Sequence, residues 1–582
     1  GPPKWDGIRL VDSMDPDNRI AHIDVGHAQD SNGSIGIIRS QCVVDDVSFH
    51  GTHIRIFYTE NSSIILENSR FPDVFGPSER ADALGLDNVS EQVKGVGAPP
   101  AGGRYIIRNN FFGTTKGHND VIDIDSGRLP APIAQIIGNT FRQTGDEHID
   151  LGGDAYVAGN VFHRVLKDDE TSDRGYANGI STGDAGSGTT IAVARNIFWD
   201  VDHAINLKRD TSTIFENNSI YKIHPDFDDR FDNPSIGGVV NLFIPTDVGP
   251  TPGDGAYLDS NIFVDLPRFF SGADLPGARV TPLEVHRTLY DPTMSDLSIG
   301  PNHPGQTVDQ LGVENLAVLP RYRDPENGDF RLLPGSPAIG AGRFGEDLGA
   351  LVSDQIFISG EPPAVTSSGN ATLLVGGPGI FSYRWRLNGG AWSAALPIGE
   401  GFDPAGTVRE AQIILTGLAD GDYTVEVEGY NFAGARQTIP TVSETWSVNA
   451  SLPGSVRLNE ILAVNSAGDD TIELFNPGTS SFALDGMSIS DDPADPQKHL
   501  FPAGTSIAPG GFLLVTAAQL AFTLDRSGET VTLSDNLGTV VDSVAFGSQL
   551  EDFSISRLGH NGAWGLSRVT LGAVNLPANT GD

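Results

Sequence analysis

The fold is decided by four short stretches of sequence: VIDID at 121–125, HIDL at 148–151, NGIST at 178–182 and HAINL at 203–207. The isoleucine that they share recurs at intervals of 27, 31 and 25 residues. A repeat of this length, built from short strands without helices between them, is typical of a β-solenoid. One turn of such a solenoid cannot bury its own apolar side, so successive turns must stack, and outward side chains far apart in the sequence then form rows on one face.

A second recurring phrase, Asn-x-Phe, supports the same arrangement. It stands at 110–112, 139–141, 160–162, 196–198 and 261–263, with a variant at 218–220. In stacked turns, inward phenylalanines pack on one another, and an inward asparagine amide bonds to the amide of the next turn. We therefore expect continuous apolar and asparagine ladders along the solenoid.

The composition indicates an all-β protein with a strongly acidic surface. The 582 residues include 70 Gly and 37 Pro, which favour turns over helices. The 75 acidic residues outnumber the 37 basic ones and leave a net charge of -38, which repels nucleic acid and anionic membranes and suits a saline environment. Since no stretch approaches the roughly 20 apolar residues of a membrane span, we expect no membrane insertion and no nucleic-acid partner.

Three units follow one another along the chain. Residues 1–350 have the solenoid pattern, and 361–449 contain short alternating strands with close turn signals, typical of an immunoglobulin-like β-sandwich. Residues 455–582 resemble the lamin tail domain through Asn459-Glu460, IELFNP at 472–477 and SGETV at 527–531. This resemblance implies a second immunoglobulin-like sandwich, which we interpret as an accessory or attachment module.

The whole chain resembles secreted bacterial carbohydrate-active proteins, with a right-handed parallel β-helix followed by an immunoglobulin-like module and a lamin tail domain. The expected fold class is therefore all-β, with two β-sandwich domains after the helix. The resemblance implies a secreted or cell-surface bacterial protein, extracellular or periplasmic, and the acidic surface favours a marine source. The β-helix endo-fucanases of glycoside hydrolase family 174 are one candidate relative.

Acidic side chains gather on one predicted face of the solenoid. When the strands are aligned by their isoleucines, Asp123 and Asp150 fall in one column and Asp125 falls in a second. A third column, just before the strand, holds Asp120 and Glu147. Turns about 4.8 Å apart bring these carboxylates close enough to share protons or a cation. We predict that they are catalytic, one aspartate acting as the base and Glu147 or another of the acids as a protonated acid.

Basic side chains near these acids predict an anionic substrate. The predicted substrate-binding residues are His118, His148, His203, Lys208 and Arg209. In a chain this acidic, local cations beside a carboxylate cleft suit a glycan that carries carboxylate or sulfate groups. Local balancing of charge is the alternative explanation for any one of them.

Three interpretations of the acidic columns stay open. The simplest is a solvated edge of a very acidic protein. The second is a carboxylate pair that cleaves a glycosidic bond, with a separation near 5 Å for a retaining and roughly 6.5–9.5 Å for an inverting reaction. The third is a Ca²⁺ site, because Asp146-Glu147-x-x-Asp150 resembles the calcium motif of polysaccharide lyase family 9, whose base is a lysine. Glu147 stands where that family has an aspartate, and Lys208, the possible base, lies one turn late.

We favour an endo-acting glycoside hydrolase that cleaves an anionic, sulfated, fucoidan-like polysaccharide without a required cofactor. The alternative enzyme is a Ca²⁺-dependent polysaccharide lyase, in which Asp146, Glu147 and Asp150 hold the ion and Lys208 removes the C5 proton. The non-enzymatic alternative is a surface protein that binds glycan through the same face. The C-terminal domains would attach the protein to a cell surface or to glycan.

Overall fold

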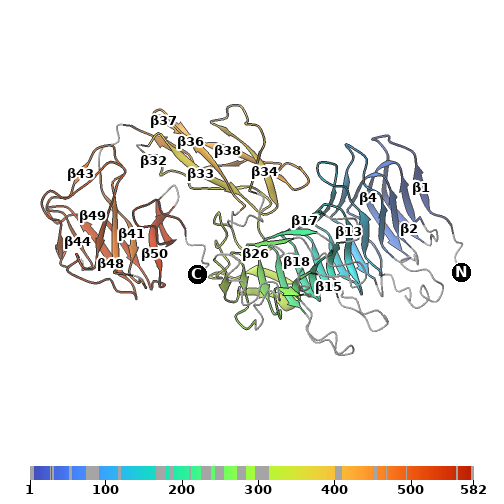
Figure 1. Cartoon of the computed structure of the whole chain (residues 1–582), viewed down its shortest axis with the longest axis horizontal. Helices are drawn as coiled ribbons and strands as arrows, with labels where there is room; N and C mark the ends of the chain where they lie inside the picture. Colours follow the sequence, from blue (N-terminus) through green and yellow to red (C-terminus); the bar gives the residue numbers. More distant parts are fainter. Residues whose placement is uncertain are drawn as a thin grey trace, which may run out of the picture.

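The structure is a computed structural model, drawn as a ribbon in Figure 1. It describes residues 5–26, 28, 32–50, 55–73, 91–115, 119–165, 178–182, 188–208, 211–223, 238–242, 255–271, 283–294, 314–366, 368–399, 409–450, 455–466, 468–492, 494–558 and 562–577. In these residues the protein is almost entirely β, and three long parallel sheets precede the antiparallel C-terminal sheets, as the sequence predicts. No helix in the described part of the chain is long and apolar enough to cross a membrane.

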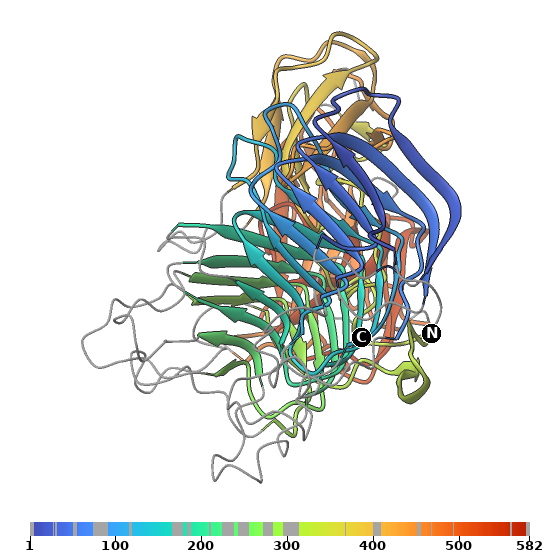
Figure 2. The ribbon, with the colours of Figure 1, turned by 90° about the vertical axis from the view of Figure 1, so that its right-hand side faces the viewer.

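The N-terminal unit is a parallel β-helix whose turns each add a strand to stacked parallel sheets (Figures 1 and 2). The first sheet contains, in spatial order, β1 (Ile8–Val11), β3 (Ile35–Ile38), β5 (Phe57–Glu60), β7 (Val93–Val96), β10 (Ile122–Asp125), β13 (Glu147–Gly152), β16 (Asn178–Thr182), β19 (His203–Leu207), β22 (Gly238–Leu242) and β25 (Phe270–Ser271). The second sheet contains β2 (Arg19–Gly26), β4 (Gln41–His50), β6 (Ser63–Glu67), β8 (Tyr105–Arg108), β11 (Ala134–Ile137), β14 (Ala155–Ala158), β17 (Thr190–Ala194), β20 (Ser212–Glu216), β23 (Gly255–Asp259) and β26 (Leu283–His286). The third contains β9 (Phe111–Thr114), β12 (Thr140–Gln143), β15 (Val161–Val165), β18 (Ile197–Val201), β21 (Ser219–Ile223), β24 (Ile262–Val264), β27 (Leu289–Tyr290) and β28 (Leu316–Ala317).

The register of the first sheet is the one that the isoleucine spacing predicts. Ile122 pairs with Ile149, Ile149 with Ile180, and Ile180 with Ile205. All four are buried in the interior of the helix. Outward residues next to them must therefore stack in columns along the face of the sheet.

The expected ladders run through the interior beside the third sheet. Asparagine amides donate to the next asparagine oxygen at 2.9–3.3 Å along Asn110, Asn139, Asn160, Asn196, Asn218 and Asn261. Phenylalanine rings stack with centroids 4.6–5.0 Å apart along Phe71, Phe112, Phe141, Phe162 and Phe198. These buried contacts join each turn to the next, so they hold the outer columns in register.

A short segment after the helix covers part of the third sheet. It contains β29 (Tyr322–Asp324), the 3-10 turn η2 (Pro325–Asn327) and β30 (Asp329–Leu332). Phe330 packs edge-on against Trp199 and Tyr221 of the sheet. Trp199 is therefore a packing residue at this surface and not part of the first sheet's outer face.

The second unit is a β-sandwich of short strands that pair antiparallel, except for β32 and β40, which pair parallel. Its strands are β31 (Phe357–Ser359), β32 (Val365–Thr366), β33 (Ala371–Gly376), β34 (Ile380–Leu387), β35 (Leu396–Pro397), β36 (Ala411–Leu415), β37 (Gly421–Tyr423), β38 (Val425–Asn431), β39 (Thr441–Val442) and β40 (Trp446–Val448). β31 lies in 351–360, between the predicted solenoid and the predicted sandwich, and it pairs with β33. The sandwich therefore begins a few residues before the predicted boundary at 361.

The third unit is also a sandwich and has its own buried core. Its strands are β41 (Arg457–Leu462), β42 (Thr471–Phe475), β43 (Phe482–Ala483), β44 (Ser488–Ser490), β45 (His499–Leu500), β46 (Ser506–Ile507), β47 (Phe512–Thr516), β48 (Glu529–Ser534), β49 (Val540–Phe546), β50 (Phe553–Leu558) and β51 (Ala563–Arg568). These elements lie within the predicted unit at 455–582.

The first sandwich packs directly on the second sheet of the β-helix (Figure 1). Arg409 of the sandwich is buried, donates to Glu216 of β20 at 2.5 Å, and lies over the Phe381 ring with 3.9 Å to its centroid. The Gly379 backbone N–H donates to the other Glu216 oxygen at 2.8 Å. The sandwich is therefore docked on the helix by a buried ion pair as well as by apolar contact.

Candidate functional site

The outer face of the first sheet carries two polar columns. In each turn one outward residue stands two positions before the inward Ile or Val, and another stands one position after it. The turns concerned are EQVK at 91–94, DVID at 120–123, EHID at 147–150, NGIS at 178–181 and HAIN at 203–206. Backbone pairing connects Lys94 with Asp123, Asp123 with Asp150, and Glu147 with Asn178. The predicted alignment of Asp123 with Asp150 and of Asp125 with Gly152 is confirmed.

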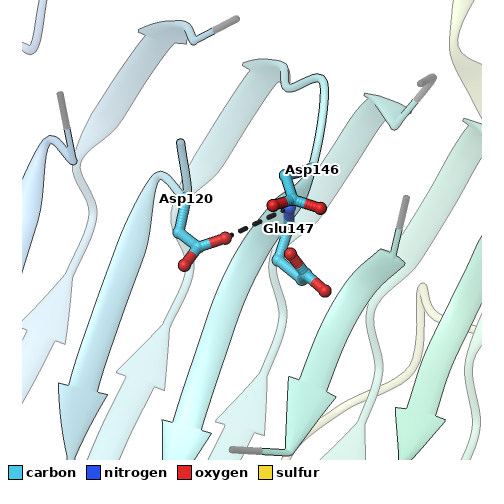
Figure 3. Close-up of side chains that lie close together, drawn as sticks. All are labelled: Asp120, Asp146 and Glu147. Atoms are coloured by element: carbon cyan, nitrogen blue, oxygen red, sulfur yellow. Dashed lines mark hydrogen bonds between the residues drawn. The ribbon is translucent and has the colours of Figure 1, made fainter. Parts of the chain in front are cut away.

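Three carboxylates converge at the start of β10 and β13, and we call Asp120, Asp146 and Glu147 the acidic cluster (Figure 3). One carboxylate oxygen from each lies within 4.8 Å of the others. The Glu147 backbone N–H donates to Asp120 Oδ1 at 3.3 Å, and the Asn178 amide donates to Glu147 Oε1 at 3.0 Å. Asp146 comes from the bend before β13, so the cluster joins two neighbouring turns.

The position of the acidic cluster favours protonated carboxyl groups. Burial raises the pKa of Asp120 well above its usual range, and repulsion from Glu147 and Asp146 raises it further. Burial and the neighbouring Asp146 raise the pKa of Glu147 in the same way, against an opposing effect of Lys208. Both groups therefore keep a proton to a higher pH than an ordinary carboxyl group does, which suits a proton donor.

Asp150 and Lys208 lie at the C-terminal side of the cluster. Burial raises the pKa of Asp150, while Lys208 acts against that rise. Burial lowers the pKa of Lys208, but attraction to Asp150 and Glu147 outweighs it and the net shift is upward. Lys208 therefore stays charged and supplies positive charge next to the carboxylates, where the sequence predicts it.

Asp123 and Asp125 lie on the more open, N-terminal side. Lys94 forms an ion pair with Asp123, whose side chain is 23% exposed. The Gly97 backbone N–H donates to the exposed Asp125 at 2.8 Å. Asp123 is thus partly exposed and held beside a cation, in contrast to the buried Glu147 carboxyl.

Sequence analysis missed Lys94, Glu91 and Arg55. Glu91 and Lys94 occupy the two outward columns one turn before Asp120 and Asp123, and Arg55 precedes β5 as Glu91 precedes β7. EQVK fits the same four-residue pattern as DVID, but it has valine in place of isoleucine and a lysine in the acidic column. An alignment by any inward aliphatic residue would have found it.

The predicted substrate-binding role of His148 does not fit its position. The ring is fully buried and lies against Phe141 and Phe162, with centroids 5.2 and 5.7 Å away. Burial lowers its pKa well below the usual range. Directly after Glu147, the first residue of β13, two consecutive residues point inward, His148 and Ile149, so simple alternation assigns the histidine to the wrong side.

His203 lies in the same column as Glu147, beyond Asn178, but it is fully buried and its Nδ1 is 3.8 Å from Asp202. It is therefore a buried neighbour of the site, and its predicted contact with substrate stays a prediction. His118 and Arg209 lie outside the described residues. Of the predicted metal ligands, Asp146 and Glu147 belong to the acidic cluster, and Asp120 takes the place predicted for Asp150.

Comparison with known proteins identifies the third unit only. The family model described as Lamin Tail Domain matches residues 449–548. No curated protein and no solved structure matches the chain. The match supports the predicted lamin tail domain, whose sandwich continues beyond the match through β50 and β51, and it carries no information on the first 448 residues or on a carbohydrate-active family.

Proposed function

We propose that the β-helix is a secreted, endo-acting glycoside hydrolase that cleaves an anionic polysaccharide on the outer face of its first sheet. The observation that carries this proposal is a difference in environment between neighbouring carboxyl groups. Glu147 is buried, Asp120 beside it is half-buried, and both have raised pKa values, whereas Asp123 is paired with Lys94. Two carboxyl groups in contrasting environments are what general acid and base catalysis of glycoside cleavage requires.

In this proposal Glu147 protonates the leaving glycosidic oxygen, and Asp123 is the ionised partner carboxylate. Asp150 and Asp125 flank these groups on the same face. Because polar columns continue into the turns on both sides of the acidic cluster, a chain lying along the helix axis would extend past the cleaved bond in both directions. That arrangement favours cleavage inside a polymer.

The anionic and sulfated character of the substrate is inferred from the cations on this face. Lys94 and Lys208 stand on opposite sides of the acidic cluster along the helix axis. In a chain with a net charge of -38, cations so close to the cleavage point favour a substrate that brings its own negative charge. Fucoidan-like sulfated glycans fit that chemistry and also the saline environment that the acidic surface suits.

The test is digestion of fucoidans, carrageenans, alginate and pectins, with calcium and with chelator. Reducing ends and near-ultraviolet absorbance of unsaturated sugars are followed together. Hydrolysis predicts new reducing ends without absorbance, and a loss of about 100- to 10,000-fold in Glu147→Gln. The matched control is Asp12→Asn, because Asp12 is an exposed acid on the same helix, paired with Arg39 away from the site. Equal activity of Glu147→Gln and the control would contradict the assignment.

A Ca²⁺-dependent lyase is the second candidate, and the convergence of three carboxylates within 4.8 Å favours it. Oxygen donors are the ligands that Ca²⁺ prefers, and three carboxylates provide up to six of its six to eight ligands. Asp120, Asp146 and Glu147 would hold the ion, which would neutralise a uronate carboxylate. Lys208 would take the C5 proton only after it loses its own, and the bound cation would favour that loss because it offsets the carboxylates that keep the lysine charged. Near-ultraviolet absorbance that disappears with chelator would favour this candidate over the hydrolase. The absence of both reducing ends and absorbance with every glycan would favour a binding protein.

A further inference from the structure

A row of four alternating charges runs along the outer face toward the acidic cluster. Arg55 Nε lies 3.0 Å from Glu91 Oε2, and Lys94 Nζ lies 3.7 Å from Glu91 Oε1. Lys94 also forms the ion pair with Asp123. The four residues belong to three successive turns, before β5, around β7 and on β10. Lys94 is therefore the link between a buried glutamate and a carboxylate of the proposed site.

The inner half of this row is rigidly enclosed. The Glu91 side chain is only 1% exposed, while those of Arg55 and Lys94 are 23% and 19% exposed. The adjacent Gln92 amide donates to the backbone oxygens of Pro72 and Gly113. Arg55 and Lys94 have long, flexible side chains. Because the Glu91 carboxylate that they bind is itself held in place, it limits the positions that their charged groups can take.

The backbone at Lys94 is held in place by the close packing of the residue that follows it. Gly95 follows it, and a Cβ there would come within 2.0 Å of the Tyr105 hydroxyl and 2.9 Å of Ile124, so the backbone of β7 is packed closely against the interior. The ammonium is held between Glu91 on its own turn and Asp123 on the next. This geometry orients Asp123 toward the N-terminal side and keeps a positive charge next to it.

We propose that Lys94 is a positioning residue for Asp123, and that the Arg55–Glu91 pair fixes Lys94 in that position. The consequence for catalysis rests on the proposed hydrolase function, in which Asp123 is the ionised carboxylate. The ion-pair chain itself does not depend on that function and is measurable without substrate. Burial raises the pKa of Glu91 to about 7, against the attraction of Lys94 and Arg55 and with added repulsion from Asp123.

The substrate-free test uses the small number of lysines. The chain has seven, so reductive methylation with ¹³C-formaldehyde gives few NMR signals, and the Lys94 signal is assigned by its loss in Lys94→Arg. We expect this signal to shift in one step with a midpoint near pH 7, and the step to vanish in Glu91→Gln. Asp123→Asn should move the signal across the whole pH range. A Lys94 chemical shift that changes with neither substitution would overturn the proposal.

The catalytic test uses the polysaccharide that the wild-type chain cleaves. We expect Lys94→Met to lower kcat by about 10- to 100-fold while KM stays within about threefold, because misplacement of a reacting group acts on the chemical step. Lys94→Arg should restore most of the loss. Arg39→Met removes a cation from another ion pair on the same helix and serves as the control. A raised KM with unchanged kcat, or no effect, would contradict positioning. If the wild-type chain cleaves no glycan, the hydrolase proposal fails. The NMR result still shows whether Glu91 and Asp123 hold Lys94 between them.

Discussion

Removing one rung of the asparagine ladder should weaken the middle of the β-helix by an amount that follows from its hydrogen bonds. Asn160 Oδ1 accepts from the Asn139 backbone N–H at 2.8 Å and from its side-chain amide at 3.0 Å. Its own amide faces three acceptors, the oxygens of Ile136, Ala158 and Asn196. Because that amide has two protons, the side chain makes about four full hydrogen bonds. At about 1 kcal/mol net for each, Asn160→Ala should cost about 4 kcal/mol.

Hydrogen exchange followed by mass spectrometry measures this loss locally, in a chain whose three units need not unfold together. A loss of about 4 kcal/mol corresponds to roughly a thousandfold faster exchange in peptides from 134–165. Asn315 stands in the same column two turns beyond Asn261, after Thr288, and it makes one donor and one acceptor contact. Asn315→Ala should therefore cost about half as much and only in the last turns. A change below about tenfold for Asn160→Ala would refute the view that the ladder joins the turns.

The docking of the first sandwich gives another prediction: Arg409→Met leaves Glu216 buried without its cation and should destabilise the docked state by about 3–5 kcal/mol, seen as an increased radius of gyration in X-ray scattering. The double variant with Glu216→Met should recover much of that loss, because no charge then stays buried. In the lamin tail domain, burial raises the pKa of Glu473 to about 7 despite donors from Gly572 and Asn459. The folded domain thus retains a proton that the unfolded chain releases above about pH 4.5, so its stability should fall between about pH 4.5 and 7, and thermal unfolding of Glu473→Gln should lack this fall. Glu147 also has a raised pKa in the folded state because it is buried, so its deprotonation at high pH should destabilise the fold. Glu147→Gln should therefore unfold at a higher temperature than the wild type in alkaline buffer.

The sequence predicts the parallel stack and its register because one side of each turn is buried. A shift by one residue would expose Ile122 and its partners, so the spacing of the isoleucines determines which outward residues align. The pairing of Asp123 with Asp150 follows directly from that spacing. The family match at 449–548 likewise agrees with motifs read from the sequence.

Sequence reasoning places side chains at bends less well than those on strands, and it also missed Lys94, which lies on β7. Asp146 reaches the acidic cluster from the bend before β13, where alternation gives no direction. His148 follows that bend and points inward together with Ile149, which a period of two excludes. Lys94 was missed because a lysine in an acidic column hides the repeat, although it forms an ion pair with Asp123 in the next turn.

The asparagine and phenylalanine ladders make each turn of the helix an exchangeable unit. A turn joins its neighbours through a few inward residues at fixed places, usually an Asn, a Phe and an aliphatic residue, and its outer residues are free to differ. Whole turns can therefore be gained or lost in evolution without redesigning the interior. Loss of the turn at 178–202 would bring His203 beside Glu147, since both pair with Asn178 today. Such an architecture can change the chemistry of its outer face one turn at a time while the same interior persists.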